Sequence, residues 1–122
     1  MTSNRILILD DHLDTRDFLS TYLSSCNIPI AVAANRWAAL EILSKSNEIA
    51  CVLVDYNMPE MTAAEFVERV RSEYPNVRCI LLTASKDAPF LAKELSVQEW
   101  VGKPISVEGL NSLVETYRRT AV

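Results

Sequence analysis

Glycine is scarce in this sequence, with two occurrences among 122 residues. Phosphate-binding loops of the G-x-G-x-x-G and G-x-x-x-x-G-K types need several glycines, because the backbone must approach the phosphate closely, and neither pattern is present. Nucleotide sites built on such loops are therefore excluded. No apolar run approaches the roughly 20 residues that a membrane-spanning helix needs, and we expect no membrane contact.

Positive charge is also in the minority, with 12 Lys and Arg against 16 Asp and Glu. The resulting net charge of −4 gives no sign of a nucleic-acid-binding surface. The three cysteines lack metal-ligand spacing, and we interpret Cys51 and Cys79 as small hydrophobic residues in strands. A reducing, cytoplasmic environment fits this cysteine usage best. Length and composition predict a single globular domain over residues 1–122.

Short apolar runs alternate with amphipathic segments along the chain. The runs predict strands at 5–10, 30–34, 49–55, 77–83 and 99–102. A helix is expected after each strand, and the predicted caps are Asp14 or Thr15, Asn35, Thr62 and Ser106. The helix after the fourth strand is expected to be short, from Asp87 to Leu95. The apolar faces expected to point inward include Phe18, Leu19, Tyr22, Leu23, Ala39, Leu40, Leu43, Phe66, Val67, Val70, Val107, Leu110, Leu113, Val114 and Tyr117.

This regular alternation predicts an α/β fold, a doubly wound five-stranded parallel sheet with helices on both faces. The flavodoxin-like strand order 2-1-3-4-5 makes the first and third strands neighbours at the switch point. Ligands of such sheets bind at the carboxyl ends of the strands. The residues at those ends are therefore the candidates for function.

Acidic side chains come at the ends of the first and third strands. Asp10 and Asp11 follow one apolar run, and Asp55 ends the other. Three neighbouring carboxylates repel one another unless a cation or a proton neutralises them, and oxygen ligands of this kind suit Mg²⁺. A carboxylate can also accept a phosphoryl group. Thr83 and Lys103 end two further strands and offer a hydroxyl and an ammonium group to the same edge. Each of these residues taken singly also has an ordinary structural explanation, as a turn former, a strand residue or a solvated side chain.

In this combination the chain resembles the CheY-like receiver domains of bacterial two-component response regulators, over nearly its whole length. The segments that carry the resemblance are Asp10-Asp11, Asp55-Tyr56-Asn57-Met58-Pro59-Glu60-Met61, Thr83-Ala84 and Lys103-Pro104. Their order and spacing together are highly specific for the family.

The resemblance implies a role for each of these residues. Asp55 is expected to accept a phosphoryl group from the phosphohistidine of a histidine kinase or a histidine phosphotransfer protein. Mg²⁺ would be held by Asp55, by Asp11 directly, by Asp10 through water, and by the backbone carbonyl of Asn57. Lys103 would pair with the phosphate and Thr83 would swing to hydrogen-bond it. The Lys103-Pro104 bond would be cis.

Four further positions bear on this resemblance. Trp100 falls where the family has an aromatic residue on the fifth strand that turns inward on activation. The alternative is that the indole simply covers apolar surface. His12 is a loop residue outside the family pattern. Ala63 and Ser96 stand where the family usually has glycine. Ala63 is accommodated if its φ is negative.

The favoured function is therefore a phosphorylation-controlled switch rather than an enzyme with other substrates. The expected partners are the phosphoryl donor and a downstream protein target or output domain, with homodimerisation on phosphorylation as a further option. The chain would act as a stand-alone regulator or as the N-terminal receiver of a longer protein.

Three other functions fit the sequence less well. A haloacid-dehalogenase-like phosphatase would need an acid-base aspartate two residues after Asp55, where Asn57 stands. A flavodoxin-like binding module would need a hydroxyl- and glycine-rich loop after the first strand, where Asp10 and Asp11 oppose a phosphate. A receiver-like scaffold that is never phosphorylated would not need the complete acidic, hydroxyl and lysine set.

Overall fold

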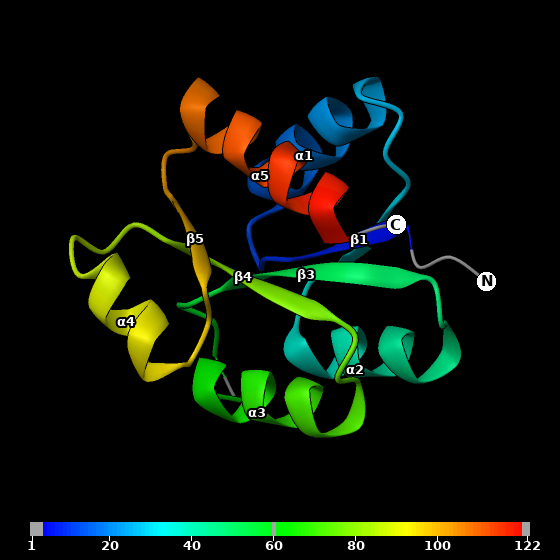
Figure 1. Ribbon diagram of the computed structural model, residues 1–122, viewed down its shortest axis with the longest axis vertical. Coiled ribbons are helices and arrows are strands. Elements are labelled where there is room, and N and C mark those ends of the chain that lie inside the picture. Colours follow the sequence, from blue (N-terminus) through cyan, green and yellow to red (C-terminus); the bar gives the residue numbers. More distant parts are fainter. Residues whose placement is uncertain (1–3, 60, 121–122) are drawn as a thin grey trace.

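The structure is a computed structural model that describes residues 4–59 and 61–120 (Figure 1). Strands and helices alternate through the described part of the chain, as the sequence predicted. The strands are β1 (Arg5–Leu9), β2 (Ile30–Ala33), β3 (Ile49–Asp55), β4 (Arg78–Thr83) and β5 (Glu99–Gly102). The helices are α1 (Leu13–Ser25), α2 (Arg36–Lys45), α3 (Ala63–Glu73), α4 (Ala88–Glu94) and α5 (Val107–Thr120).

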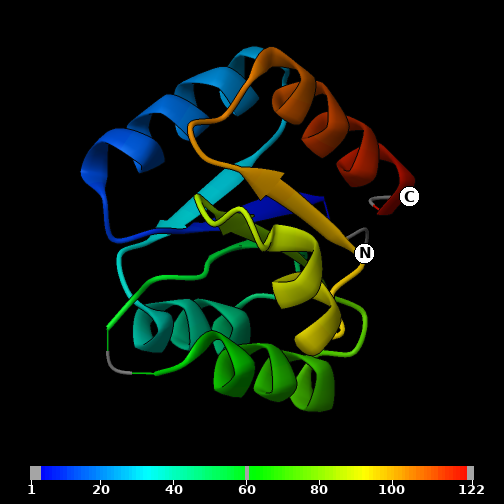
Figure 2. The same ribbon diagram turned by 90° about the vertical axis from the view of Figure 1, so that its left-hand side faces the viewer.

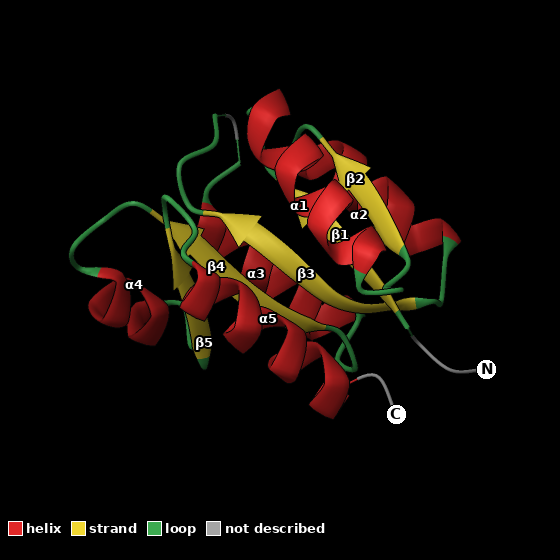
Figure 3. Ribbon diagram, turned by 90° about the horizontal axis from the view of Figure 1, so that it is seen from above, coloured by secondary structure: helices red, strands yellow, loops and turns green. Residues whose placement is uncertain are grey.

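The five strands form one parallel sheet in the order β2-β1-β3-β4-β5, which confirms the predicted fold class. Helices α1 and α5 cover one face, and α2 and α3 cover the other (Figures 1 and 2). Seen from above, α4 lies beside β5 at the edge of the sheet (Figure 3). None of the described helices is long and apolar enough to cross a membrane.

Alternating residues of the central strands fill two cores. Ile6 and Ile8 of β1 pack with the α1 and α5 side, whereas Leu7 and Leu9 pack with the α2 and α3 side. The strand period of two residues sends successive side chains to opposite faces. All seven residues of β3 are buried, because helices cover both faces of this central strand.

The helix caps hold the loops at the functional edge of the sheet. The Asn35 side chain accepts a hydrogen bond from the Ala38 N–H, and Thr62 forms a complete capping box with Glu65. Ser106 accepts from the Gly109 N–H at 3.0 Å. These three caps were predicted.

Some local predictions were wrong. Helix α1 begins at Leu13 with His12 as its N-cap, and neither Asp14 nor Thr15 caps it. Phe18 is 49% exposed and Val107 is 73% exposed, so neither joins the core. Both residues lie at the margin of an apolar stripe, where the sequence period alone does not decide which way a side chain points.

The backbone bears out two further expectations. The Lys103–Pro104 peptide bond is cis. Among the described residues that are not glycine, only Asn27 and Ser96 have positive φ, at 61° and 57°. Ala63 therefore starts α3 without strain, whereas Ser96 adopts the left-handed conformation that favours glycine.

Candidate functional site

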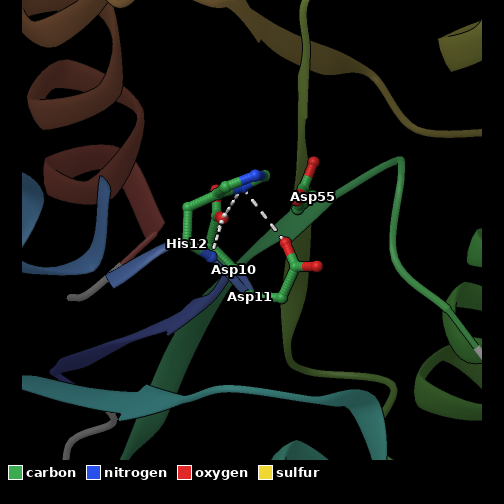
Figure 4. Close-up of side chains that lie close together, drawn as sticks. All are labelled: Asp10, Asp11, His12 and Asp55. Atoms are coloured by element: carbon green, nitrogen blue, oxygen red, sulfur yellow. Dashed lines mark hydrogen bonds and ion pairs between the residues drawn. The ribbon is translucent and has the colours of Figure 1, made fainter. Parts of the chain in front are cut away.

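The acidic residues of β1 and β3 meet at the carboxyl edge of the sheet. Leu9 pairs with Val54 across the two strands, so the next residue on each, Asp10 and Asp55, lie side by side. Ligand atoms of Asp10, Asp11, His12 and Asp55 all lie within 4.8 Å of one another. Figure 4 shows the three carboxylates and the imidazole gathered where the two strands end. The predicted convergence of the acidic residues is therefore present.

Lys103 reaches this cluster from the end of β5. Its Nζ donates to Asp10 Oδ2 at 2.6 Å and lies 3.3 Å from Asp55 Oδ1. Burial alone would lower the pKa of Lys103, but the hydrogen bond with Asp10 and the charge of Asp55 outweigh it and raise the pKa. Lys103 is therefore a cation in contact with both carboxylates.

Asp10 and Asp55 are both buried, yet their pKa values shift in opposite directions. Burial raises the pKa of Asp55, and the charge of Asp10 adds to this, while Lys103 and the Asn57 N–H act against it. For Asp10 burial also acts upward, but hydrogen bonds from Lys103 and His12 outweigh it and lower the pKa. Asp10 is therefore the better satisfied of the two carboxylates.

His12 takes part in the cluster more closely than its place in a loop suggested. Its Nδ1 lies 3.1 Å from Asp10 Oδ1 and 3.1 Å from Asp11 Oδ1. Its backbone N–H also donates to Asp10 Oδ1, at 2.9 Å. The side chain is still 68% exposed. The imidazole therefore covers the Asp10 and Asp11 carboxylates from the solvent side.

Thr83 and Asn57 lie near Asp55, whereas Trp100 lies further back along β5. Thr83 ends β4, next to β3, and its buried hydroxyl accepts a hydrogen bond from the Ser85 N–H at 3.1 Å. Asn57 is exposed, and its N–H donates to Asp55 Oδ1 at 3.3 Å. Trp100 lies on β5 and is 43% exposed, so its indole has not turned into the core. The structure thus brings Thr83 and Asn57 to the acidic edge.

Arg36 is a further residue of this region, and the sequence reading missed it. It is the first residue of α2 and only 1% exposed. Its guanidinium donates to the backbone carbonyls of Asp55 at 2.6 Å, Tyr56 at 3.1 Å and Met61. One signal was present in the sequence: a cation in the first turn opposes the helix dipole and needs another reason to be there.

The donor set fits a hard divalent cation such as Mg²⁺. Three carboxylates supply oxygen ligands, which Mg²⁺ prefers. Asp55 Oδ2 is buried and has no hydrogen-bond donor among the described residues, so it lacks the partner that a buried carboxylate oxygen needs. Both oxygens of Asp10 already accept hydrogen bonds, from Lys103 and His12. Asp11 and Asp55 are therefore the residues with oxygen atoms available for direct ligation.

Comparison with known proteins places this chain in a family. The profile of the response regulator receiver domain matches residues 6–115. Sporulation initiation phosphotransferase F of Bacillus subtilis is 29% identical over 119 residues, which cover 96% of this chain and 95% of that protein. The transcriptional regulatory protein SrrA of Staphylococcus aureus is 33% identical over 106 residues, which cover 85% of this chain and 43% of that protein. The chain thus spans less than half of the length of this second relative.

A solved structure shows the same fold. The chemotaxis protein CheY4 of Vibrio cholerae superimposes with a TM-score of 0.79 at 29% sequence identity, over 96% of this chain and 98% of that one. The order of strands therefore agrees with a known architecture as well as with the sequence pattern.

Proposed function

The chain belongs to the family of response regulator receiver domains of two-component systems, and we propose that it accepts a phosphoryl group on Asp55 in a reaction that requires Mg²⁺. The observation that carries this proposal is the buried Asp55 carboxylate, which has one oxygen without a donor, beside Asp10 and Asp11 and in contact with Lys103. Receiver domains interact with histidine kinases or phosphotransfer proteins, and one of these would be the donor.

The proposed reaction moves one phosphoryl group between two side chains. A carboxylate oxygen of Asp55 attacks the phosphorus of the donor's phosphohistidine. The bond between phosphorus and the imidazole nitrogen breaks, and its electron pair stays on that nitrogen. The products are an acyl phosphate on Asp55 and a free histidine on the donor. When bound by the acidic cluster, Mg²⁺ supplies positive charge that neutralises the transferring oxygens.

The residues around Asp55 position the group and neutralise its charge. The Lys103 ammonium lies 3.3 Å from Asp55 and can pair with a phosphoryl oxygen on that side. The Thr83 hydroxyl sits at the end of the neighbouring strand and can donate to another phosphoryl oxygen. The phosphoryl group adds about −1.5 to −2 charges, and these contacts would compensate for it.

The phosphorylated state would be read through the surface near β4 and β5. Thr83 pairs with Gly102 across these strands, and Trp100 stands two residues before Gly102. Movement of Thr83 toward the phosphoryl group would open space that favours an inward indole. We propose that this surface then contacts a protein target or output domain, and that the domain turns over no substrate apart from its own phosphoryl group.

Intact-mass measurement with acetyl phosphate and Mg²⁺ tests this proposal. We expect a single phosphoryl adduct that is stable in acid and labile in base, absent with EDTA and absent in Asp55→Asn. Glu68→Gln on the exposed side of α3 serves as the matched control and should form the adduct normally. An adduct that persists in Asp55→Asn, or steady hydrolysis of a phosphomonoester, would contradict the proposal.

A further inference from the structure

The buried Arg36 has no carboxylate partner at ion-pair distance among the described residues. Its charge is instead compensated by three backbone carbonyls, those of Asp55, Tyr56 and Met61. Burial lowers the pKa of Arg36, while the charges of Asp55, Asp11 and Glu65 act in the opposite direction. Arginine keeps its charge even when buried. A permanent, buried cation is therefore held against the backbone at the end of β3.

The three acceptors of Arg36 lie on both sides of the segment that follows Asp55. Asp55 and Tyr56 stand where β3 ends, and Met61 stands just before Thr62, the cap of α3. The planar guanidinium presents its donors in a fixed fork, so it sets the relative position of the carbonyls it binds. Through them α2 is tied to the backbone that carries Asp55 and Asn57.

Arg36 and Lys103 are thus two cations with different attachments. Lys103 binds the Asp10 and Asp55 carboxylates through a flexible stem, so its ammonium can follow an incoming anion. Arg36 binds backbone carbonyls and is 99% buried, so it cannot move without breaking them. Lys103 neutralises charge at the reacting atoms, whereas Arg36 holds the loop between β3 and α3, residues 56–62.

We propose that Arg36 is a positioning residue for the metal and phosphoryl site. It holds the backbone after β3 so that the Asn57 carbonyl and the Asp55 carboxylate face the same ion, which is an inference that rests on the proposed function. Replacing a residue that hydrogen-bonds to a metal ligand, rather than binding the metal itself, typically changes metal affinity by about 10- to 100-fold.

The two possible effects of replacing Arg36 change Mg²⁺ affinity in opposite directions. Loss of the charge would strengthen binding, whereas displacement of the backbone that carries the ligands would weaken it. Arg36→Met removes a positive charge that interacts with the charges of Asp55 and Asp11, and this loss by itself strengthens their attraction for Mg²⁺. A weaker Mg²⁺ affinity in a folded Arg36→Met protein is therefore opposite to the effect of charge and indicates that the backbone after β3 has moved. Arg36→Lys keeps the charge but loses the fork, so it isolates the effect of position.

The experiment measures Mg²⁺ affinity by intrinsic fluorescence, the initial rate of phosphorylation by acetyl phosphate, and the urea midpoint for each variant. We expect the Mg²⁺ dissociation constant to rise at least about tenfold in Arg36→Met and by a smaller factor in Arg36→Lys. The matched control is Arg69→Met on α3, an arginine whose side chain is 48% exposed and paired with Glu73 at 3.1 Å. It loses the same charge and should bind Mg²⁺ as the unmodified protein does.

Two outcomes would overturn the inference. One is an Arg36→Met variant that is less stable but binds Mg²⁺ as tightly as the unmodified protein or more tightly. The other, which decides the matter if Arg36→Met does not fold, is an Arg36→Lys variant with unchanged Mg²⁺ affinity and phosphorylation rate.

Hydrogen exchange separates this inference from the proposed function. The Tyr56 N–H donates to the Leu82 carbonyl at 2.9 Å, and the Asn57 N–H donates to Asp55. If Arg36 holds the loop, both amides exchange at least about tenfold faster in Arg36→Lys, while Ile80 within β4 is unchanged. Should the unmodified protein fail to bind Mg²⁺, the proposed function fails, and these exchange rates still decide whether Arg36 positions the loop.

Discussion

Lys103 forms its shorter ion pair with Asp10, at 2.6 Å, and its longer one with Asp55, at 3.3 Å. Asp10 is fully buried, and a buried carboxylate without a partner is strongly destabilising. Lys103 therefore stabilises the buried Asp10 carboxylate even without a phosphoryl group at the site. Its distance from Asp55 leaves that carboxylate less neutralised and so more open to a second cation.

The first prediction concerns the structural task of Lys103. Lys103→Met leaves Asp10 buried without its main partner, so we expect a loss of about 3 kcal/mol in the free energy of unfolding in urea with EDTA. Lys45→Met is the matched control, because Lys45 is 74% exposed and pairs only loosely with Glu41 at 3.9 Å. It should stay within about 0.5 kcal/mol of the unmodified protein. Equal losses in the two variants would contradict the assignment.

The second prediction is a pH dependence that follows from Asp55. Because its pKa is raised in the folded state, ionising Asp55 costs stability, and the cost develops as pH rises from the ordinary carboxylate pKa through the raised one. Asp55→Asn removes this cost. With EDTA present, we expect the variant to have a higher urea midpoint than the unmodified protein at pH 7, with a gap that closes as pH falls through that window.

Asp10 provides the opposite case for the same measurement. Its pKa is lowered in the folded state, so its ionisation contributes stability that is present above the ordinary carboxylate pKa and is lost as pH falls through the lowered one. Asp10→Asn should therefore have a lower urea midpoint than the unmodified protein at pH 7. Shifts of the same sign in the two variants would refute the assignment of the two carboxylates.

The third prediction concerns the metal. A ligand that binds only the folded state raises the free energy of unfolding, by about 2.7 kcal/mol when its concentration is 100 times the dissociation constant. We expect Mg²⁺ to raise the urea midpoint, and we expect Asp11→Ala to lose most of this effect because Asp11 has oxygen atoms available for ligation. Asp14→Ala, an exposed acidic change in the first turn of α1, should keep it. An unchanged Mg²⁺ response in Asp11→Ala would remove Asp11 as a ligand.

The fourth prediction links Thr83 to Trp100. If the Thr83 hydroxyl moves toward the phosphoryl group, the 43% exposed indole of Trp100 becomes more buried and its emission shifts to shorter wavelength. The shift is expected with acetyl phosphate and Mg²⁺ in the Trp37→Phe background, where Trp100 is the remaining tryptophan. Thr83→Ala should still form the adduct on Asp55 but lose the shift. A full shift in Thr83→Ala would mean that Trp100 does not follow Thr83.

The fifth prediction concerns backbone strain at Ser96. Its φ of 57° is unfavourable for any residue with a Cβ, and glycine removes that strain at some cost in chain entropy. We expect Ser96→Gly to raise the free energy of unfolding by about 0.5 kcal/mol. Ser112→Gly, on the exposed side of α5, should lower it by a similar amount, because glycine is a poor helix former. Changes of the same sign at both positions would contradict this account.

Several features were accessible from the sequence because they depend on local order. The span of β3 (Ile49–Asp55) was predicted to the residue, since a continuous apolar run ends on a carboxylate there. The capping box of Thr62 and Glu65 follows from their three-residue spacing. The placement of Asp10 beside Asp55 follows once the strand order is known. Phe18 and Val107 were misplaced because burial at the edge of an apolar stripe depends on neighbours from other elements.

Arg36 marks the limit of reading a sequence for function. Its three acceptors come from residues 19 to 25 positions away. These acceptors are backbone carbonyls, which every residue has, so no pattern of side chains in the sequence predicts the contact. The preference of Lys103 for Asp10 over Asp55 was hidden for a related reason, because a difference of less than 1 Å depends on how β1, β3 and β5 pack.

The amino-acid order by itself determined the alternation of strands and helices and the identity of the residues at the strand ends, because periodicity, caps and strand termination act over a few residues. Only the tertiary structure decided which of those residues are in contact and which carboxylate forms the shorter ion pair with Lys103. It also decided that an arginine at the start of a helix lies buried behind the acidic edge. These outcomes depend on distances between segments far apart in the chain, which are set when the two helical layers close on the sheet.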